Sequence, residues 1–345
     1  MRPNTPSLLV GYGSVGRYHA AALASVASSL AIVDTSADAR QRAEQAHPQA
    51  LVADRLEALD GSMDWPSAMA TIATWGPSHA PFFHALADRG VRRILCEKPL
   101  ASSVGLARAM VERSEREGIA LAVHHYIRYA GLVPAMRRFA GDRGLGEPVA
   151  VVSAGGACCL LTNGIHLVDF AIDLFSAAPQ RVVSTAAGAS INPRSADLMF
   201  YGGTAVWSFA GGREAVISFN NGSSLAWVTK VFYRNAVVEF DGDLLARVDA
   251  RDAAAVERWP KITRTGPASQ PLALGGLDGV LPFEQGLLAA LEDVAGGRPL
   301  VCPGSVGQVA VSACIGALVS GGEGRVVELP IDPESSLGGE SWPIS

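Results

Sequence analysis

A glycine motif directly after a short apolar run constrains the fold of this chain more than any other feature. Residues 7–10 are mostly apolar, and residues 11–16, GYGSVG, follow the pattern G-x-G-x-x-G at the start of a helical sequence. In such a turn the glycines allow a tight bend, a close approach to a pyrophosphate, and close packing of the helix on the strand. The pattern predicts a dinucleotide-binding unit, with an ordinary tight turn as the alternative. The predicted cofactor contacts in this turn are Gly11, Tyr12, Gly13, Ser14, Val15 and Gly16.

A second apolar run, residues 30–33, ends in Asp34. An acid about 20 residues beyond the glycines can accept hydrogen bonds from the adenosine ribose hydroxyls and repel a 2′-phosphate. Asp34 therefore predicts NAD as the cofactor. NADP stays open, because Thr35 and Ser36 are small enough to admit a phosphate if Asp34 turns away. The alternative is a solvated aspartate after a strand.

Composition excludes several classes of function. The chain has 345 residues, enough for two domains, and its net charge of -5 without a long basic run argues against a nucleic-acid partner. The sequence lacks a signal-peptide pattern and an apolar stretch of membrane-span length. Its 5 cysteines are scattered without metal-ligand spacing, so we expect no metal site and a reduced, cytoplasmic compartment.

Residues 1–124 alternate strand-like and helical patterns, which predicts a parallel sheet with helices on both faces. Ligands of such sheets bind outside the carboxyl ends of the strands. The glycine motif, Asp34, Thr74, Glu97-Lys98-Pro99 and residues 124–129 all fall at predicted carboxyl ends. The predicted strands are 8–10, 30–33, 51–53, 69–74, 93–96 and 119–123, and the predicted helices are 14–24, 38–46, 55–59, 78–89 (capped by Ser78) and 102–117.

Residues 125–345 have a different pattern, which predicts a second, α+β domain with a large, mostly antiparallel open sheet. Residues 251–276 are polar and predict a loop, and we expect the tail beyond Pro330 to be loosely ordered. The predicted strands are 149–154, 182–185, 197–201, 204–209, 215–219, 224–233, 236–240 and 326–329, and the predicted helices are 132–139, 163–175, 283–294 and 306–319.

The motif Glu97-Lys98-Pro99 after the fifth predicted strand makes the chain similar to the Gfo/Idh/MocA oxidoreductases. The resemblance also rests on the glycine motif, Asp34, residues 72–74 with His79, GIHLVD at 164–169 and GRVVELP at 324–330. It implies an N-terminal NAD(P)-binding Rossmann domain and a C-terminal domain whose open sheet commonly forms the interface of a homodimer or homotetramer. It also implies a cis peptide before Pro99.

Two side chains are the predicted catalytic groups. Lys98 at a strand end can hydrogen-bond a substrate oxygen and polarise it, and the resemblance implies this role. His166 has a near-neutral pKa that suits proton transfer, and the matching histidine of the family lines the active site. A surface lysine and a histidine packed in the core are the alternatives.

The sequence departs from the family at one position near His166. The family pattern D-x-G-x-H becomes Thr162-Asn163-Gly164-Ile165-His166, and a threonine cannot hold the negative charge of the expected acid. Asp169, one turn further, is expected to orient the His166 imidazole, contact substrate or pack the helix. Arg128 is expected to pair with a substrate anion or to be solvated, and Trp75 to stack on a ligand or fill the core. The remaining predicted substrate contacts are His125, Tyr126, Thr162 and Asn163, and the further cofactor contacts are Thr74, Trp75, His79, Glu97 and Lys98.

These observations favour an NAD(P)-dependent oxidoreductase that transfers a hydride between the nicotinamide and a hydroxyl or keto carbon of a sugar, sugar nucleotide or cyclitol. A redox-assisted glycosidase with tightly held NAD and a non-catalytic cofactor-binding sensor remain as alternatives. We also expect a homo-oligomer through the β-rich half, because helices that could cover its apolar strands are few in the sequence. The apolar residues of that expected interface are Val206, Phe209, Val216, Ile217, Phe219, Val228, Val231 and Phe232.

Overall fold

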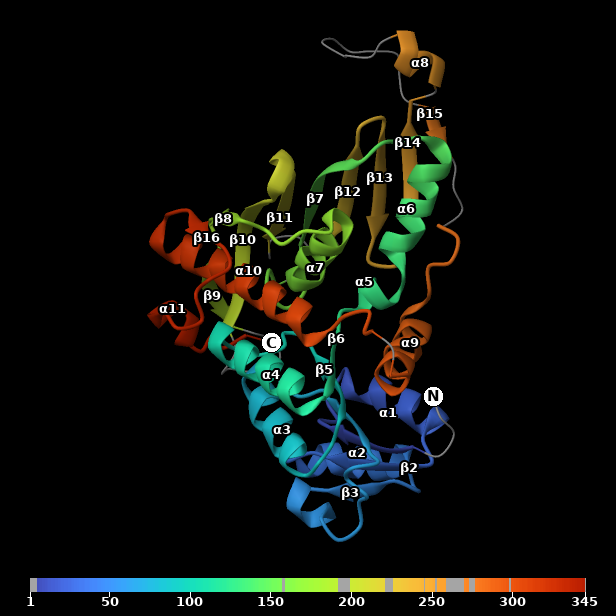
Figure 1. Ribbon diagram of the computed structural model, residues 1–345, viewed down its shortest axis with the longest axis vertical. Coiled ribbons are helices and arrows are strands. Elements are labelled where there is room, and N and C mark those ends of the chain that lie inside the picture. The colour runs from blue at the N-terminus through green and yellow to red at the C-terminus, as the bar shows by residue number, and fades with distance from the viewer. Residues whose placement is uncertain are drawn as a thin grey trace.

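The protein consists of two sheets, each with helices packed against it, and the chain returns from the second to the first near its end (Figure 1). This computed structural model describes residues 5–156, 159–191, 199–220, 226–244, 246–251, 253–258, 270–272, 277–297 and 299–344. The predicted fold class, a Rossmann-type parallel sheet plus a second, mostly antiparallel sheet, is confirmed.

The first sheet is parallel, with its strands in the order β3-β2-β1-β4-β5-β6. The strands other than the edge strand β3 are mostly buried on both faces, as expected for a sheet covered by helices on each side. Because all strands point the same way, their carboxyl ends meet at one edge, which faces the second unit in Figure 1. The strands are β1 (Pro6–Val10), β2 (Ser29–Val33), β3 (Leu51–Ala53), β4 (Met69–Ile72), β5 (Arg93–Glu97) and β6 (Ala120–His124).

Local sequence signals explain three helix ends of this unit. The Ser36 and Ser103 hydroxyls cap their helices by accepting hydrogen bonds from main-chain N–H groups, and Gly118 ends a helix with a φ of 63°. The predicted Ser78 cap is wrong, because Gly76 and Pro77 already begin that helix and the Ser78 hydroxyl donates to Thr74 or to a main-chain carbonyl. The helices are α1 (Gly16–Val26), α2 (Ala37–Ala46), α3 (Gly76–Asp88) and α4 (Val104–Glu117).

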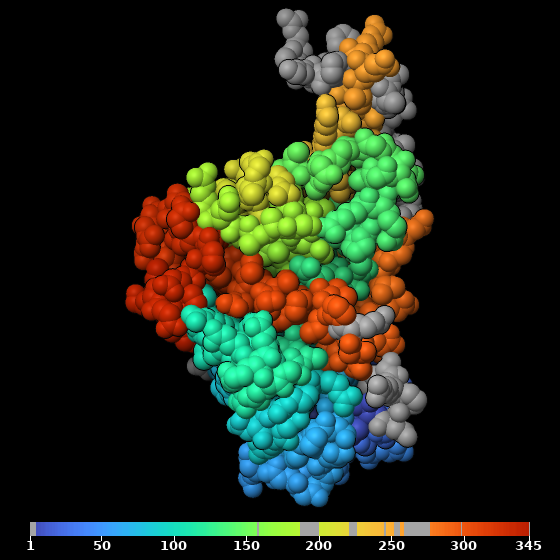
Figure 2. All heavy atoms as spheres, viewed as in Figure 1, coloured from blue at the N-terminus to red at the C-terminus, as the bar shows by residue number. Residues whose placement is uncertain are grey.

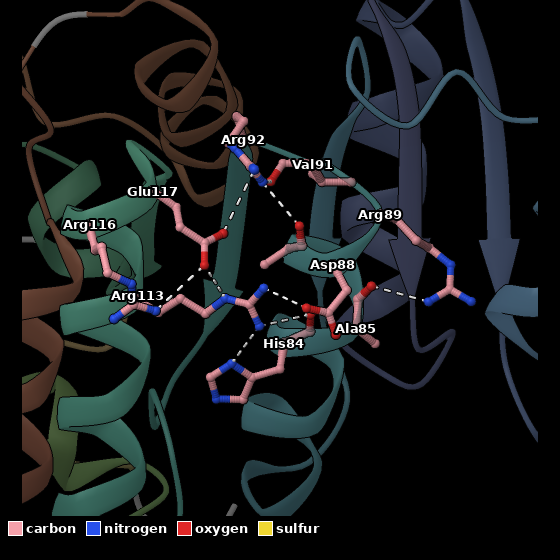
Figure 3. Close-up of polar contacts among 10 residues, drawn as sticks. His84, Ala85, Asp88, Arg89, Val91, Arg92, Arg113, Arg116 and Glu117 are labelled. Atoms are coloured by element: carbon pink, nitrogen blue, oxygen red, sulfur yellow. Dashed lines mark hydrogen bonds and ion pairs between the residues drawn. The ribbon is translucent and has the colours of Figure 1, made fainter.

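An arginine on α4 ties α3 and α4 together on the outside of the first unit (Figure 3). Arg113 donates to Glu117 at 2.8 Å on its own helix, and to Asp88 at 2.5 Å and the His84 carbonyl at 3.3 Å on α3. One guanidinium thus satisfies three acceptors. This network lies away from the carboxyl ends of the strands, so it stabilises the unit without entering the site.

The second sheet is mixed, with the strand order β15-β14-β13-β12-β7-β11-β10-β8-β16 and with β9 paired to β10. β7 and β11 run parallel, and the other pairs among the described strands run antiparallel. The strands are β7 (Pro148–Gly156), β8 (Arg181–Ser184), β9 (Ala187–Ile191), β10 (Met199–Ser208), β11 (Glu214–Asn220), β12 (Val228–Tyr233), β13 (Ala236–Asp241), β14 (Ala246–Ala250), β15 (Gln270–Leu272) and β16 (Val327–Glu328).

One face of the second sheet is covered by helices, and the other is open. The helices α7 (Gly164–Phe175) and α10 (Gly304–Glu323) pack on the covered face, where Trp207 donates to the Ala313 carbonyl at 3.0 Å. Successive side chains along a strand point to opposite faces of the sheet. The apolar residues predicted to form the oligomer interface are therefore divided between the covered and the open face. Phe209, Ile217, Phe219 and Val231 are buried, whereas Val206, Val216, Val228 and Phe232 are partly or well exposed.

The helix α10 is longer than predicted, because its glycines serve packing rather than termination. A Cβ at Gly321 would lie 2.1 Å from the Ala186 carbonyl oxygen, and one at Gly307 would lie 2.5 Å from Val123. The helix ends instead at Gly324, with a φ of 65°. By length and composition α10 could cross a membrane, contrary to our expectation, but 72% of that stretch is buried inside the protein.

The last part of the chain packs on the first unit, so the predicted loose tail is wrong. The Trp342 N–H donates to the Ser102 carbonyl at 2.8 Å, and Ile344 is buried beside Gly76. Figure 2 shows the orange and red C-terminal segments against α4. The predicted loop at 251–276 contains a helix and a strand, β15; residues 252, 259–269 and 273–276 of it lie outside the described residues. The remaining helices are α5 (Tyr126–Tyr129), α6 (Leu132–Arg143), α8 (Ala253–Arg258), α9 (Phe283–Ala295) and α11 (Ser336–Gly339).

Candidate active site

A cavity of about 720 Å³ crosses the carboxyl ends of β2, β1, β4 and β5. Its lining begins at Asp34 on one side, passes the glycine turn, and ends at Glu97 and Lys98. This is the place where parallel sheets of this class bind ligands. The lining residues are Val10, Gly11, Gly13, Ser14, Val15, Val33, Asp34, Thr35, Ser36, Ala73, Thr74, Trp75, Ser78, Phe82, Glu97 and Lys98.

The glycine turn fits a dinucleotide by its shape. Gly11 has a φ of 96°, and a Cβ there would lie 2.7 Å from the Ala73 carbonyl oxygen. A Cβ at Gly16 would lie 2.1 Å from the Gly11 carbonyl oxygen, so both positions need glycine. A Cβ at Gly13 would meet no atom within 4 Å, and Gly13 lines the cavity. The turn therefore leaves room for a pyrophosphate at the N-terminus of α1.

Asp34 lies at the other side of the turn and is held in place by main-chain groups. Its carboxylate accepts hydrogen bonds from the Tyr12 N–H at 2.7 Å and the Ser36 N–H at 2.8 Å. Carboxylate oxygens have further lone pairs, so the group can still accept from ribose hydroxyls. Arg40 donates to the Asp34 and Thr35 main-chain carbonyls at 2.9 Å each, which places a cation near the same end of the cavity.

Lys98 connects the two units of the protein. It follows β5, and the Lys98–Pro99 peptide is cis, as predicted. Its Nζ donates a hydrogen bond to the Thr162 main-chain carbonyl at 2.9 Å, just before α7 begins. Lys98 thus contacts the main chain of Thr162, the residue that replaces the family's acid. This contact does not depend on which side chain is present at position 162.

His166 lies in the first turn of α7, near Lys98. Its ring is 4.7 Å from the Tyr126 ring and 5.5 Å from the His125 ring, and its Nδ1 is buried without a hydrogen-bond partner. Burial, and then the positive charge of Lys98, hold the pKa of His166 well below its usual range. The imidazole is therefore neutral at pH 7 and can accept a proton.

Two predicted substrate contacts are paired inside the protein. Asp169 is fully buried and accepts from the Arg128 guanidinium at 2.8 Å and 3.1 Å, and Asp173 lies 3.3 Å from the same guanidinium. Burial alone would lower the pKa of Arg128, but Asp169 more than offsets it and raises this pKa. These residues join α5 to α7. These contacts support the helix-packing alternative for Asp169, and Arg128, though paired, also lines a separate cavity of about 380 Å³ beside Asp173.

Other predicted residues divide between the cavity and the interior. Trp75 is 41% exposed at the cavity rim, so it does not fill the core, and Thr74 lines the cavity too. His79 is fully buried, with its ring nitrogens 2.8 Å and 3.1 Å from the Pro99 and Thr74 carbonyl oxygens, so its predicted cofactor contact is corrected. The Asn163 side chain accepts from the Cys159 N–H at 3.2 Å.

His125 is buried against the paired acid. Its Nδ1 lies 3.9 Å from an Asp169 carboxylate oxygen, and neither ring nitrogen has a hydrogen-bond partner. Burial lowers the pKa of His125 to about 4, so the ring is neutral at pH 7. His125 is thus packed between Asp169 and His166, and neither histidine is among the residues that line the cavity.

A buried network around Glu97 was missed by our sequence reasoning. One carboxylate oxygen accepts from His19 Nε2 on α1 at 2.7 Å and from His124 Nδ1 at the end of β6 at 2.8 Å, and the other accepts from the Lys98 N–H at 3.2 Å. The three ligand-type atoms lie within 4.8 Å of one another, but the contacts have hydrogen-bond lengths. The sequence feature that could have pointed to this network is His19, which lies three residues beyond Gly16 and therefore on the same face of α1.

Comparisons with known proteins support an NAD-binding Rossmann fold for the first unit. Residues 7–125 match the family model described as an oxidoreductase family with an NAD-binding Rossmann fold. D-apiose dehydrogenase of Paraburkholderia graminis is 36% identical over 142 residues, which is 35% of this chain and 38% of that protein. 1,5-Anhydro-D-fructose reductase of Ensifer adhaerens is 38% identical over 64 residues, 19% of each chain. The matches thus span less than two fifths of either curated relative.

The structural comparison extends over nearly the whole chain. An NAD-binding protein from Listeria innocua superimposes with a TM-score of 0.76 at 17% identity, over 96% of this chain and 99% of that one. This likeness shows the fold of both units. The family model matches the NAD-binding unit alone, so residues 7–125 are similar to the Gfo/Idh/MocA oxidoreductase family.

Proposed function

We propose that this protein is an NAD-dependent oxidoreductase that acts on a hydroxyl or keto carbon of a sugar, sugar nucleotide or cyclitol. The observation that carries the proposal is the hydrogen bond from Lys98 Nζ to the Thr162 carbonyl. It brings the end of the cofactor cavity to the N-terminus of the helix that carries His166. The substrate class is supported by the curated relatives, whose names describe a sugar dehydrogenase and a sugar reductase.

NAD supplies hydride acceptance and donation, and the two side chains handle the proton. In oxidation the neutral His166 accepts the hydroxyl proton, and Lys98 holds the oxygen by a hydrogen bond. In reduction the charged lysine stabilises the developing alkoxide. Because the family's acid is replaced by Thr162, this division leaves the proton transfer to Lys98 and His166.

The same purified protein distinguishes the alternatives. A redox-assisted glycosidase would retain NAD and turn over a glycoside without added cofactor. A sensor would bind NAD and a sugar without forming NADH. The proposed enzyme forms NADH from added NAD only when a hydroxyl substrate is present, which absorbance at the NADH band measures.

We expect Asp34 to make NAD the preferred cofactor. Its carboxylate is fixed by two N–H groups and cannot easily turn away from a 2′-phosphate. Isothermal titration should therefore show tighter binding of NAD than of NADP, and Asp34→Ser should reduce that preference because the repulsion is lost while Arg40 remains nearby. Tighter binding of NADP to the unaltered protein would contradict the assignment.

We also propose a homo-oligomer through the open face of the second sheet. Val183 and Val228 are 47% and 40% exposed there, and Val206, Val216 and Phe232 lie on the same face. An uncovered apolar sheet face normally has a partner. Sedimentation at micromolar concentration should give a dimer or larger species, and Val228→Lys should weaken it, with the remote Arg116→Ala as control. A monomer in the unaltered protein would rule out this interface.

A further inference from the structure

We propose that Glu97 sets the redox preference of the nicotinamide end of the cavity: its buried carboxylate favours NAD⁺ over NADH. The inference rests on the proposed function only in placing the nicotinamide beside Lys98. Asp34 takes the adenosine ribose and the glycine turn takes the pyrophosphate, so the rest of the cavity, at Glu97 and Lys98, remains for the nicotinamide.

The first step of the argument is that Glu97 is held as an anion. Burial alone would raise its pKa, but the attraction and hydrogen bonds of His124 and His19 outweigh burial and hold the pKa well below the usual range. The Lys98 N–H donates to its second oxygen. Glu97 is 6% exposed and still lines the cavity, so water screens its charge poorly.

The second step concerns the groups that face Glu97, of which His19 does not cancel its charge. Burial lowers the pKa of His19, which keeps that ring neutral at pH 7. Burial also lowers the pKa values of His79 on α3 and His166 on α7. The negative charge of Glu97 acts in the opposite direction on both pKa values but does not outweigh burial. His124 and His19 each have one buried ring nitrogen without a hydrogen-bond partner. Lys98 is the neighbouring cation, and it is unchanged in the variants below.

The third step is the sign of the effect. The oxidised nicotinamide ring carries a positive charge and the reduced ring does not, so a fixed anion stabilises the oxidised form. The site therefore holds NAD⁺ more tightly relative to NADH than it would without Glu97. Bound NADH is thereby the stronger hydride donor. A tenfold change in the ratio of dissociation constants corresponds to about 30 mV for a two-electron couple.

Equilibrium binding tests the proposal without any substrate, so its outcome is independent of the substrate class and of turnover. The dissociation constants of NAD⁺ and NADH are measured by titration for the unaltered protein and for Glu97→Gln. Loss of a unit charge from this end of the cavity, at an effective dielectric constant of about 20, predicts roughly a tenfold rise in the ratio Kd(NAD⁺)/Kd(NADH). An unchanged ratio in a folded Glu97→Gln would overturn the proposal.

Two control variants show whether a change in the ratio comes from the charge of Glu97, from a charge elsewhere in the cavity, or from altered packing. Asp34→Asn removes the same charge three strand spacings away, about 14 Å, and should weaken both cofactors equally. His124→Asn keeps the carboxylate and should keep the ratio. If either control shifts the ratio as much as Glu97→Gln, the proposal is wrong. Should Glu97→Gln not fold, the variant His19→Leu, Glu97→Met, His124→Leu removes the charge together with its partners and is judged by the same ratio.

Discussion

Lys98→Met should lower kcat by about 10²–10⁴-fold in a protein that still binds NAD. A positioned acid or base typically contributes that much to the rate, and methionine cannot donate a hydrogen bond to the reacting oxygen. The NAD contacts at the glycine turn and Asp34 lie elsewhere in the cavity, so the cofactor should still bind. Steady-state kinetics give kcat, and titration gives the dissociation constant of NAD.

Thr162→Ala is the matched control for Lys98→Met. The contact from Lys98 Nζ is to the Thr162 main-chain carbonyl, which alanine retains. Thr162→Ala should therefore cost much less than Lys98→Met, whereas His166→Ala should lower kcat strongly. If Lys98→Met keeps near-normal turnover, the lysine is not catalytic. If Thr162→Ala is as damaging as Lys98→Met, the threonine hydroxyl takes part in the proton transfer.

Asp169→Ala should lower the free energy of unfolding by about 3–5 kcal/mol, because it leaves the Arg128 guanidinium buried without its main partner. The carboxylate is fully buried and accepts two hydrogen bonds from Arg128. Asp173 lies 3.3 Å from the same guanidinium and is partly exposed, so it can compensate only in part. Denaturant unfolding followed by circular dichroism measures the effect.

The partner residue supplies the control for Asp169→Ala. Adding Arg128→Met to Asp169→Ala removes the unpaired charge and should recover part of the lost stability, since apolar replacements of buried ion pairs are often tolerated. Asp173→Ala alone should cost less than Asp169→Ala. A loss below about 1 kcal/mol for Asp169→Ala would mean that the pair behaves like an exposed ion pair.

The first unit could be predicted closely because its signals are local. Apolar runs, glycines and serine caps mark the strands and helices, and a parallel sheet places the strand ends at one edge whatever the details. That rule brought the glycine turn, Asp34 and Lys98 to one cavity, where the structure has them. The cis peptide before Pro99 was expected from the family resemblance and is present.

The contacts that the sequence missed join elements far apart in the chain. The spacing of Asp169 from His166 puts them one turn apart on α7, but the partner of Asp169 comes from α5, 41 residues earlier. Likewise, Glu97 meets His19 on α1, 78 residues away. The ends of α10 and the packed tail depend on close approach to Ala186 and Ser102, which have no periodic signal in the sequence.

The most direct test of the account is NADH formation by the purified protein, with added NAD and a panel of sugars, cyclitols and sugar nucleotides. The account predicts a rise in absorbance at the NADH band with at least one member of the panel. It also predicts that Lys98→Met, which still binds NAD, loses most of that rate. A protein that binds NAD but forms NADH with no member of the panel, or a Lys98→Met variant as fast as the unaltered protein, would contradict the proposed function.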